Sequence, residues 1–196
     1  PDTYTVTEQV PDGWRLIDIW CSEDGGVGDL GSNTANIELG GGAVVTCVFT
    51  NTRKTGVITF TKVVSGGEDS PSEWKFAVDG PEAESGIPHQ GERELETGVY
   101  TVTESGLTTY TLHSAGGVCY LAGGEVKLGV TEAGGTCVIT NTRDTGTIEV
   151  IKQLEPSEDG GKFDLKVDGD VEKVDAGDED TTGKVTVATG EHVVSE

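Results

Sequence analysis

The chain has 196 residues and a formal net charge of −22, from 35 acidic and 13 basic side chains. A surface of this charge repels phosphate backbones and anionic membranes, which argues against nucleic acid as a partner. No stretch reaches the roughly 18 apolar residues of a membrane span, so we expect no direct membrane insertion. Methionine is absent and aromatic residues are few, so the core must rely on Val, Ile, Leu and Thr-rich segments.

Apolar residues alternate with Thr and other polar residues along the chain, and glycine-rich turns separate the alternating runs. This period of two is typical of β-strands, and no useful length of the sequence has the period of a helix. The predicted fold class is therefore all-β. Two sheets packed face to face, in an immunoglobulin-like or transthyretin-like (prealbumin-like) sandwich, are the natural architecture.

In chain order, three strand-like segments each occur twice: Tyr4-Thr-Val-Thr-Glu8 and Tyr100-Thr-Val-Thr-Glu104, Cys47-Val-Phe-Thr-Asn51-Thr-Arg53 and Cys137-Val-Ile-Thr-Asn141-Thr-Arg143, Gly56-Val-Ile-Thr-Phe-Thr-Lys62 and Gly146-Thr-Ile-Glu-Val-Ile-Lys152. The copies lie roughly 90 to 100 residues apart, which is the size of a small β-sandwich domain. A fixed long period of this kind predicts a tandem array of one structural unit.

The repeats divide the chain into three parts. Residues 1–55 correspond to the C-terminal part of a first unit, residues 56–146 to a complete unit, and residues 147–196 to the N-terminal part of a third. We interpret this as a window on a longer array; the alternative is that half-units of neighbouring chains complete each other. In the complete unit we predict strands at 57–64, 72–79, 94–104, 107–114, 124–131 and 135–142.

Four cysteines occupy the same two places in successive units. An even count at repeated positions argues for the disulfides Cys21–Cys47 and Cys119–Cys137, and hence for an oxidising, extracellular or cell-surface location. Zinc binding is the rival interpretation, but the chain has no Cys-x-x-Cys pair and no histidine at ligand spacing. We therefore predict no metal at the cysteines.

Lys62, Glu104 and Asn141 each continue the otherwise apolar face of a predicted strand, because alternate strand residues share a face. If these faces form the core, the three groups must satisfy one another, since a buried unpaired charge or amide costs several kcal/mol. The alternative is that each face ends in solvent near the strand end.

A desolvated, neutral lysine amine in contact with a carboxamide can attack the carboxamide carbon, while a protonated glutamate polarises the carbonyl and moves protons. Ammonia leaves and a Lys–Asn isopeptide bond remains; an uncrosslinked polar network is the alternative. Because the reaction happens once, it is a self-formed cross-link, and we predict neither enzyme activity nor a cofactor.

The order of these motifs resembles the prealbumin-like, collagen-adhesin B-type repeats of Gram-positive pilins and surface adhesins, including SpaA-like domains. The resemblance rests on Gly-x-Ile-x-Phe-x-Lys at the start of a unit, Tyr-Thr-Val-Thr-Glu in its middle and Phe-Thr-Asn-Thr at its end, and it spans the whole chain. It implies that the lysine of the first strand bonds to the asparagine of the last strand, promoted by the glutamate.

Carried over residue by residue, the resemblance implies one complete set, Lys62, Glu104 and Asn141. The remaining members form incomplete sets: Glu8 with Asn51, which lack a lysine, and Lys152 with Glu196, which lack an asparagine. The cysteine pairs depart from the family's best-known cross-linked repeats, and His192 stands where the other copies have tyrosine.

We predict no binding site at the acidic stretches or at Trp74. Acidic stretches within residues 22–33 and 168–180 lack the spacing of an EF-hand loop, so we expect solvated turns and no bound metal. Trp74 lies in an alternating segment. We therefore expect its side chain to cover the core, and we favour this interpretation over one in which Trp74 stacks on a sugar.

The predicted protein is a non-enzymatic, acidic, secreted tandem repeat of a cell-surface stalk, pilus, filament or adhesin, whose partners are neighbouring copies or repeats. The links between units, at residues 51–56 and 141–146, are short, which favours a semi-rigid rod. Three alternatives remain: an adhesin module that recognises a host or surface protein or glycan through its loops, a spacer array in a secreted enzyme, and a filament of swapped half-units.

Overall fold

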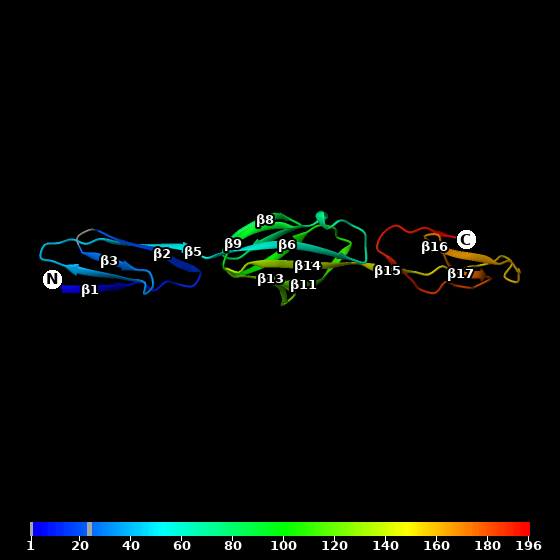
Figure 1. Cartoon of the computed structure of the whole chain (residues 1–196). Coiled ribbons are helices and arrows are strands. Elements are labelled where there is room, and N and C mark those ends of the chain that lie inside the picture. The colour runs from blue at the N-terminus through cyan, green and yellow to red at the C-terminus, as the bar shows by residue number, and fades with distance from the viewer. Residues whose placement is uncertain (1, 23–24) are drawn as a thin grey trace. The chain divides into compact units, whose positions relative to one another are not determined.

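The computed structural model describes residues 2–22 and 25–196. Over these residues, regular structure consists of nineteen β-strands and one short 3₁₀ helix, η1 (Pro71–Glu73), with no α-helix (Figure 1). The all-β prediction is confirmed. The chain divides into two compact units, of which the first comprises residues 1–62, 74–105 and 114–139 and the second residues 63–73, 106–113 and 140–196.

The first unit begins with two small antiparallel sheets, one in the order β1-β4-β3 and one that pairs β2 with β5. Their strands are β1 (Asp2–Thr7), β2 (Trp14–Cys21), β3 (Gly26–Asp29), β4 (Thr34–Leu39) and β5 (Cys47–Arg53). β3 packs closely on β2 at two glycines. A Cβ at Gly26 would lie 2.5 Å from the Cβ of Cys21, and one at Gly28 would lie 2.5 Å from the carbonyl oxygen of Ile19. Only glycine permits this approach of the two sheets.

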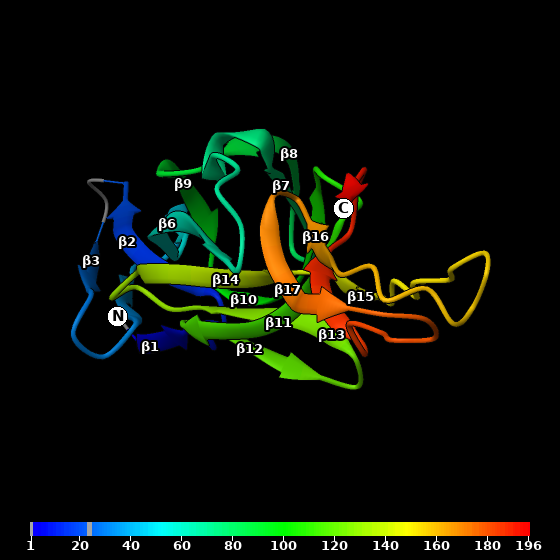
Figure 2. The ribbon, with the colours of Figure 1, turned by 90° about the vertical axis from the view of Figure 1, so that its right-hand side faces the viewer.

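Two larger sheets form a β-sandwich with the strand orders β12-β13-β10-β7-β8 and β11-β14-β6-β9 (Figure 1 and Figure 2). The strands are β6 (Thr55–Ser65), β7 (Lys75–Asp79), β8 (Ala83–Pro88), β9 (Gly91–Glu96), β10 (Gly98–Ser105), β11 (Tyr110–Gly117), β12 (Cys119–Ala122), β13 (Glu125–Val130) and β14 (Gly135–Arg143). Phe60 of β6 and Phe76 of β7 meet between the sheets, with ring centroids 5.7 Å apart. The prediction of a face-to-face sandwich is therefore confirmed.

The core of the sandwich follows the alternation that the sequence predicts. In β6 the residues Ile58, Phe60 and Lys62 are buried, and in β10 Tyr100 and Val102 are buried, while their neighbours in sequence are more exposed. The period of two in the sequence thus becomes one covered and one open face on each strand.

The structure corrects three of the predicted strands. The predicted strand 94–104 is two strands, β9 and β10, because the chain passes from one sheet to the other at Thr97, whose N–H bonds to the Lys54 carbonyl oxygen. The strand predicted at 72–79 begins only at Lys75, since η1 precedes it, and the strand predicted at 107–114 is displaced to β11. β8 and β12 were not predicted, because these short strands at the sheet edge carry little alternation.

The second unit contains two further small sheets, the pair β15-β18 and the three-stranded sheet β17-β16-β19. Their strands are β15 (Thr145–Ile148), β16 (Phe163–Val167), β17 (Asp170–Ala176), β18 (Val185–Ala188) and β19 (Val194–Ser195). A single antiparallel bridge between Ile151 and Thr181 extends the β15-β18 pair. Leu165, Val167 and Ala176 are buried and form the core of this part.

Candidate functional site

Lys62 lies inside the sandwich and contacts Glu104. The alternation of β6 directs the lysine inward, where its side chain has no exposed surface, and its Nζ lies 2.5 Å from Oε2 of Glu104 on β10. The ammonium also lies 5.1 Å from the ring centroid of Trp74, which is itself buried as predicted. The predicted pairing of Lys62 with Glu104 is thus present in the geometry.

The surroundings of Lys62 act on its pKa in opposite directions. Burial lowers the pKa of Lys62, because the charged form loses its hydration, and the hydrogen bond and negative charge of Glu104 offset only part of this effect. A lysine with a lowered pKa is a better nucleophile at neutral pH than an exposed one.

Asn141 is the second buried polar residue of the sandwich, with 2% of its surface exposed. It lies on β14, which is the sheet neighbour of β6. Lys62 and Asn141 therefore occupy adjacent strands, and both belong to the covered side of their sheet.

The N-terminal sheets contain a second pair of predicted site residues. Nδ2 of Asn51 on β5 donates a hydrogen bond of 2.6 Å to Oε1 of Glu8, which follows β1 directly. The other oxygens, Oε2 of Glu8 and Oδ1 of Asn51, are buried and accept no hydrogen bond from the described residues. The glutamate and asparagine of this copy thus meet in the absence of a lysine.

The C-terminal sheets contain the converse pair. Nζ of Lys152 lies 2.7 Å from Oε2 of Glu196 and 3.9 Å from the ring centroid of Phe163. The lysine is mostly covered, whereas half of the Glu196 side chain is exposed. A lysine, a glutamate and an aromatic ring therefore recur together, as in the cluster of Lys62, Glu104 and Trp74.

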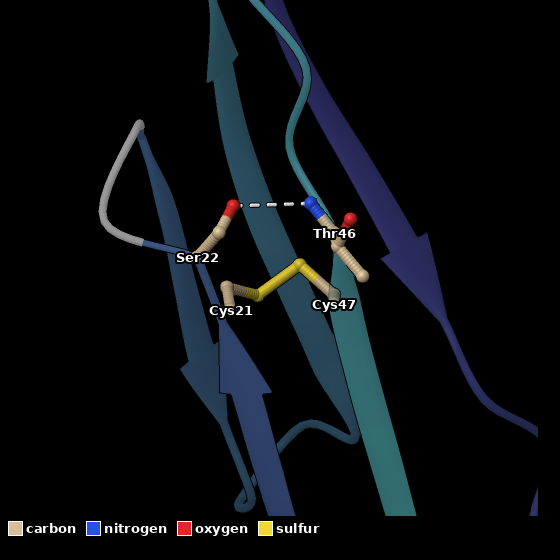
Figure 3. The surroundings of a disulfide bond; sticks show 4 residues. All are labelled: Cys21, Ser22, Thr46 and Cys47. Carbon is tan, nitrogen blue, oxygen red and sulfur yellow. Dashed lines mark hydrogen bonds between the residues drawn. A yellow bond between two sulfur atoms is a disulfide. The ribbon is translucent and has the colours of Figure 1, made fainter.

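The four cysteines form two disulfides, Cys21–Cys47 and Cys119–Cys137. The first joins the ends of β2 and β5, and the backbone N–H of Thr46 donates to the hydroxyl of Ser22 beside it (Figure 3). The second joins β12 to β14 and so links the two sheets of the sandwich. These sulfur atoms are not available as zinc ligands.

Two features of the site were missed from the sequence. The backbone N–H of Lys62 donates to Nδ1 of His89, 3.0 Å away, which fixes β6 at the position of the lysine. A cavity of about 290 Å³ opens beside Glu104, with Lys75, Gly86 and Ser105 among its lining residues. No local sequence pattern predicts either feature. The hydrogen bond to His89 depends on the turn from β8 to β9, and the cavity depends on the pairing of β7 with β8 and β10.

The sequence predicted no metal site and no membrane-spanning segment. Within residues 2–22 and 25–196, no cluster of three or more His, Cys, Asp or Glu side chains is arranged to hold a metal ion. Residues 23 and 24, part of one acidic stretch, lie outside the described residues. No helix in the described part of the chain is long and apolar enough to cross a membrane.

Comparison with known proteins places the fold. Residues 1–53 match a family described as a prealbumin-like fold domain. No curated protein sequence is similar enough to count as a match. The solved structure of the Bacillus anthracis TIE protein is similar, with 13% identity and a TM-score of 0.51, over 97% of this chain and 44% of that one. At this identity the likeness concerns the fold, and the chain spans less than half of the TIE protein chain.

Two Streptococcus pyogenes structures also match. The major pilin T3.2 has 17% identity and a TM-score of 0.33 over 72% of this chain and 67% of its own. The major pilin T-13 has 18% identity and the same TM-score over 72% of this chain and 66% of its own.

Proposed function

We propose that the chain, whose residues 1–53 match a family described as a prealbumin-like fold domain, is a non-enzymatic structural segment of an extracellular stalk, pilus, filament or adhesin. In this proposal the sequence repeats are residues 1–55, 56–146 and 147–196, and the partners of the chain are neighbouring repeats or copies. Covalent staples inside the units resist proteolysis and mechanical force. Disulfides support an oxidising, extracellular location.

The observation that carries the proposal is the buried pair of Lys62 and Glu104 in a sandwich whose neighbouring strand holds the buried Asn141. A buried ion pair is poor evidence for stability by itself, because an apolar pair of the same volume is often as stable. A chemical role accounts for placing it there. In the proposed role, Lys62 and Asn141 form an isopeptide bond that Glu104 promotes.

The proposed bond forms without any external reactant. One proton passes from Lys62 Nζ to the Glu104 carboxylate, which converts the ion pair into a neutral amine and a neutral acid. The amine attacks Cγ of Asn141. The Nζ–Cγ bond forms, the Cγ–Nδ2 bond breaks, and an amine proton reaches the leaving nitrogen by way of Glu104, so that ammonia departs.

The division into units is supported by comparing equivalent residues. Tyr100 of β10 is 1% exposed, whereas its counterpart Tyr4 of β1 is 51% exposed. The sandwich covers Tyr100, whereas no described residues cover Tyr4 to the same extent. This is the difference expected if residues 1–55 supply only part of a unit.

The test is the intact mass of the oxidised and the reduced chain, followed by a peptide map. We expect the reduced chain to weigh less than its sequence by one ammonia, with the peptides that contain Lys62 and Asn141 joined. Glu104→Ala and Asn141→Ala are each expected to lack this joined peptide. Lys127→Ala is the matched control, because Lys127 forms a more exposed pair with Glu125 and is expected to keep the mass loss.

A full, unmodified mass in the unaltered chain would remove the isopeptide from the proposal and leave disulfides as the only covalent staples. A mass loss that persists in Asn141→Ala would place the bond at another residue. Either result is read directly from the peptide map, without reference to the stability of the variants.

A further inference from the structure

The two links between repeats are built on the same backbone bridge. At the first link, the N–H of Lys54 donates to the Gly13 carbonyl oxygen at 2.9 Å, and the Lys54 carbonyl oxygen accepts from the N–H of Thr97 at 2.8 Å. Gly13 precedes β2, and Thr97 separates β9 from β10. One link residue is therefore hydrogen-bonded to the repeat behind it and to the repeat ahead of it.

The second link repeats this pattern at the equivalent positions. The N–H of Asp144 donates to the Thr109 carbonyl oxygen at 3.0 Å, and the Asp144 carbonyl oxygen accepts from the N–H of Thr189 at 2.8 Å. Lys54 and Asp144 occupy the same place in the repeat but have opposite charges. The bridge thus depends on the path of the backbone and not on the side chain of the link residue.

An arginine precedes the link residue in each case and reaches both repeats. The guanidinium of Arg53 lies 4.3 Å from the ring centroid of Trp14 in the repeat behind, and its NH1 lies 3.4 Å from Oε2 of Glu96 in the repeat ahead. Stacking of a planar cation on an aromatic face fixes the plane of the guanidinium, so that its edge is presented to the carboxylate.

Arg143 does the same with different partners. Its guanidinium lies 5.1 Å from the ring centroid of Tyr110, its NH1 donates to the hydroxyl of Thr109 and pairs with Asp69, and its NH2 donates to the carbonyl oxygen of Thr189 at 2.5 Å. Tyr110 donates its own hydroxyl to Asp69, which closes a network on the repeat behind. Arg143 is also less exposed than Arg53, at 19% against 45% of the side chain.

We propose that Arg53 and Arg143 are clamp residues that lock each repeat onto the next, so that the links act as fixed joints and not as flexible tethers. The repeat behind supplies an aromatic face and a carbonyl acceptor, and the repeat ahead supplies an acceptor for the guanidinium and the amide of a threonine. The inference rests on the proposed function only in treating these segments as successive repeats. It requires no isopeptide bond, so the two proposals fail independently.

The test is amide hydrogen exchange of the whole oxidised chain, followed by NMR, in Arg53→Ala and Arg143→Ala. We expect Arg53→Ala to raise the exchange of the Lys54 and Thr97 amides, on the order of tenfold, and to leave those of Asp144 and Thr189 unchanged. Arg143→Ala is expected to do the reverse, with a larger effect because its clamp is less exposed. Each joint is thereby the control for the other.

Two further measurements separate a joint from general stability. Arg93→Ala removes an arginine that pairs with Glu84 within the sandwich, and it is expected to leave both joints unchanged. Arg53→Lys keeps the charge without the planar stack and is expected to give an intermediate rise. Unchanged exchange at the altered joint, or a common rise at both joints and throughout β13, would overturn the proposal.

Discussion

Lys152 Nζ lies 2.7 Å from Oε2 of Glu196, so the C-terminal copy reproduces the contact between Lys62 and Glu104. Both lysines also lie near an aromatic ring: Lys152 near Phe163 and Lys62 near Trp74. A lysine–glutamate contact beside an aromatic ring therefore occurs twice in the described residues.

Glu104→Gln is expected to destabilise the sandwich strongly. The substitution leaves the fully buried ammonium of Lys62 without its carboxylate, and breaking a buried pair from one side costs about 3 kcal/mol or more. Urea unfolding measures the change. Glu125→Gln is the control, because the pair with Lys127 is exposed and solvent screens it, so its loss should change the stability little.

Lys62→Met distinguishes pairing from packing. Methionine fills much of the same volume without a charge, and the Glu104 carboxylate, which is 19% exposed, keeps access to water. We therefore expect Lys62→Met to cost less free energy of unfolding than Glu104→Gln. Both variants lack the proposed isopeptide bond, so an equal or larger cost in Lys62→Met would mean that the unpaired Lys62 ammonium contributes little to the cost of Glu104→Gln.

The two disulfides are expected to differ in their ease of reduction. Cys119 and Cys137 are buried, whereas Cys21 and Cys47 are each partly exposed. Because a thiolate must reach the sulfur atom that it attacks, a mild reductant should open Cys21–Cys47 first. Timed alkylation and mass mapping measure the order, and simultaneous opening would contradict it.

Loss of the buried disulfide is expected to be costly. The bond between Cys119 and Cys137 closes a chain separation of 18 residues, and a loop of this size contributes about 3 kcal/mol. Replacing both cysteines by serine should lower the free energy of unfolding by about that amount. Unfolding in urea, compared with the unaltered chain under oxidising conditions, measures the loss.

The period-two pattern and the internal repeat were sufficient to predict the fold class and the inward direction of Lys62. Both depend on local sequence, because neighbouring strand residues must point to opposite faces whatever the strand pairs with. The repeated segments could also be aligned with one another, which identified equivalent residues in each copy. A contact between Lys62 and Glu104 was expected only on the condition that these faces form the core, and solvent-exposed strand ends remained the alternative.

The division of residues 94–104 into β9 and β10 could not be predicted in the same way. The alternation continues across Thr97, and only the hydrogen bond of its N–H to the Lys54 carbonyl oxygen shows that the chain changes sheets there. The stacking of Arg53 on Trp14 was missed for a related reason. Its partners lie in segments far apart in sequence, and no periodicity relates them.

His192 is expected to titrate above its ordinary pKa. The hydrogen bonds to the Asp168 carboxylate and to the Ala188 carbonyl oxygen raise the pKa of His192 above 6.5. A raised folded-state pKa means that this stabilisation is complete below pH 6.5 and is lost as the pH rises through the higher value. The N–H of Val193 and the imidazole of His192 lower the pKa of Asp168 below 3.8, so its contribution is lost only as the pH falls below that value.

An NMR titration of the His192 ring measures this relationship. Asp168→Asn should bring the pKa of His192 down toward 6.5; asparagine suits the positive φ of 53° at this position, so the turn is expected to persist. Asp164→Asn is the control, because that carboxylate accepts the N–H of Asp175 and not the imidazole. An unchanged pKa in Asp168→Asn would contradict the assignment.

Asn51→Asp is expected to make the N-terminal sheets sensitive to pH. The Asn51 amide donates to Glu8 at 2.6 Å, and an aspartate there would place a second carboxylate against the first. One of the two must then bind a proton, so the pKa of the pair rises above that of either carboxyl alone. Stability should be retained at acid pH and lost, by about 1 to 3 kcal/mol, as the pH rises to neutral.

The fluorescence of Trp14 and Trp20 reports on this part of the chain during unfolding. Asn36→Asp provides the matched control in the same sheets, because Asn36 accepts a hydrogen bond from the Thr5 hydroxyl, which a carboxylate can accept equally well. We expect Asn36→Asp to unfold like the unaltered chain at every pH. If Asn51→Asp did the same, Glu8 and Asn51 would have to lie apart in solution, which would contradict the hydrogen bond between them.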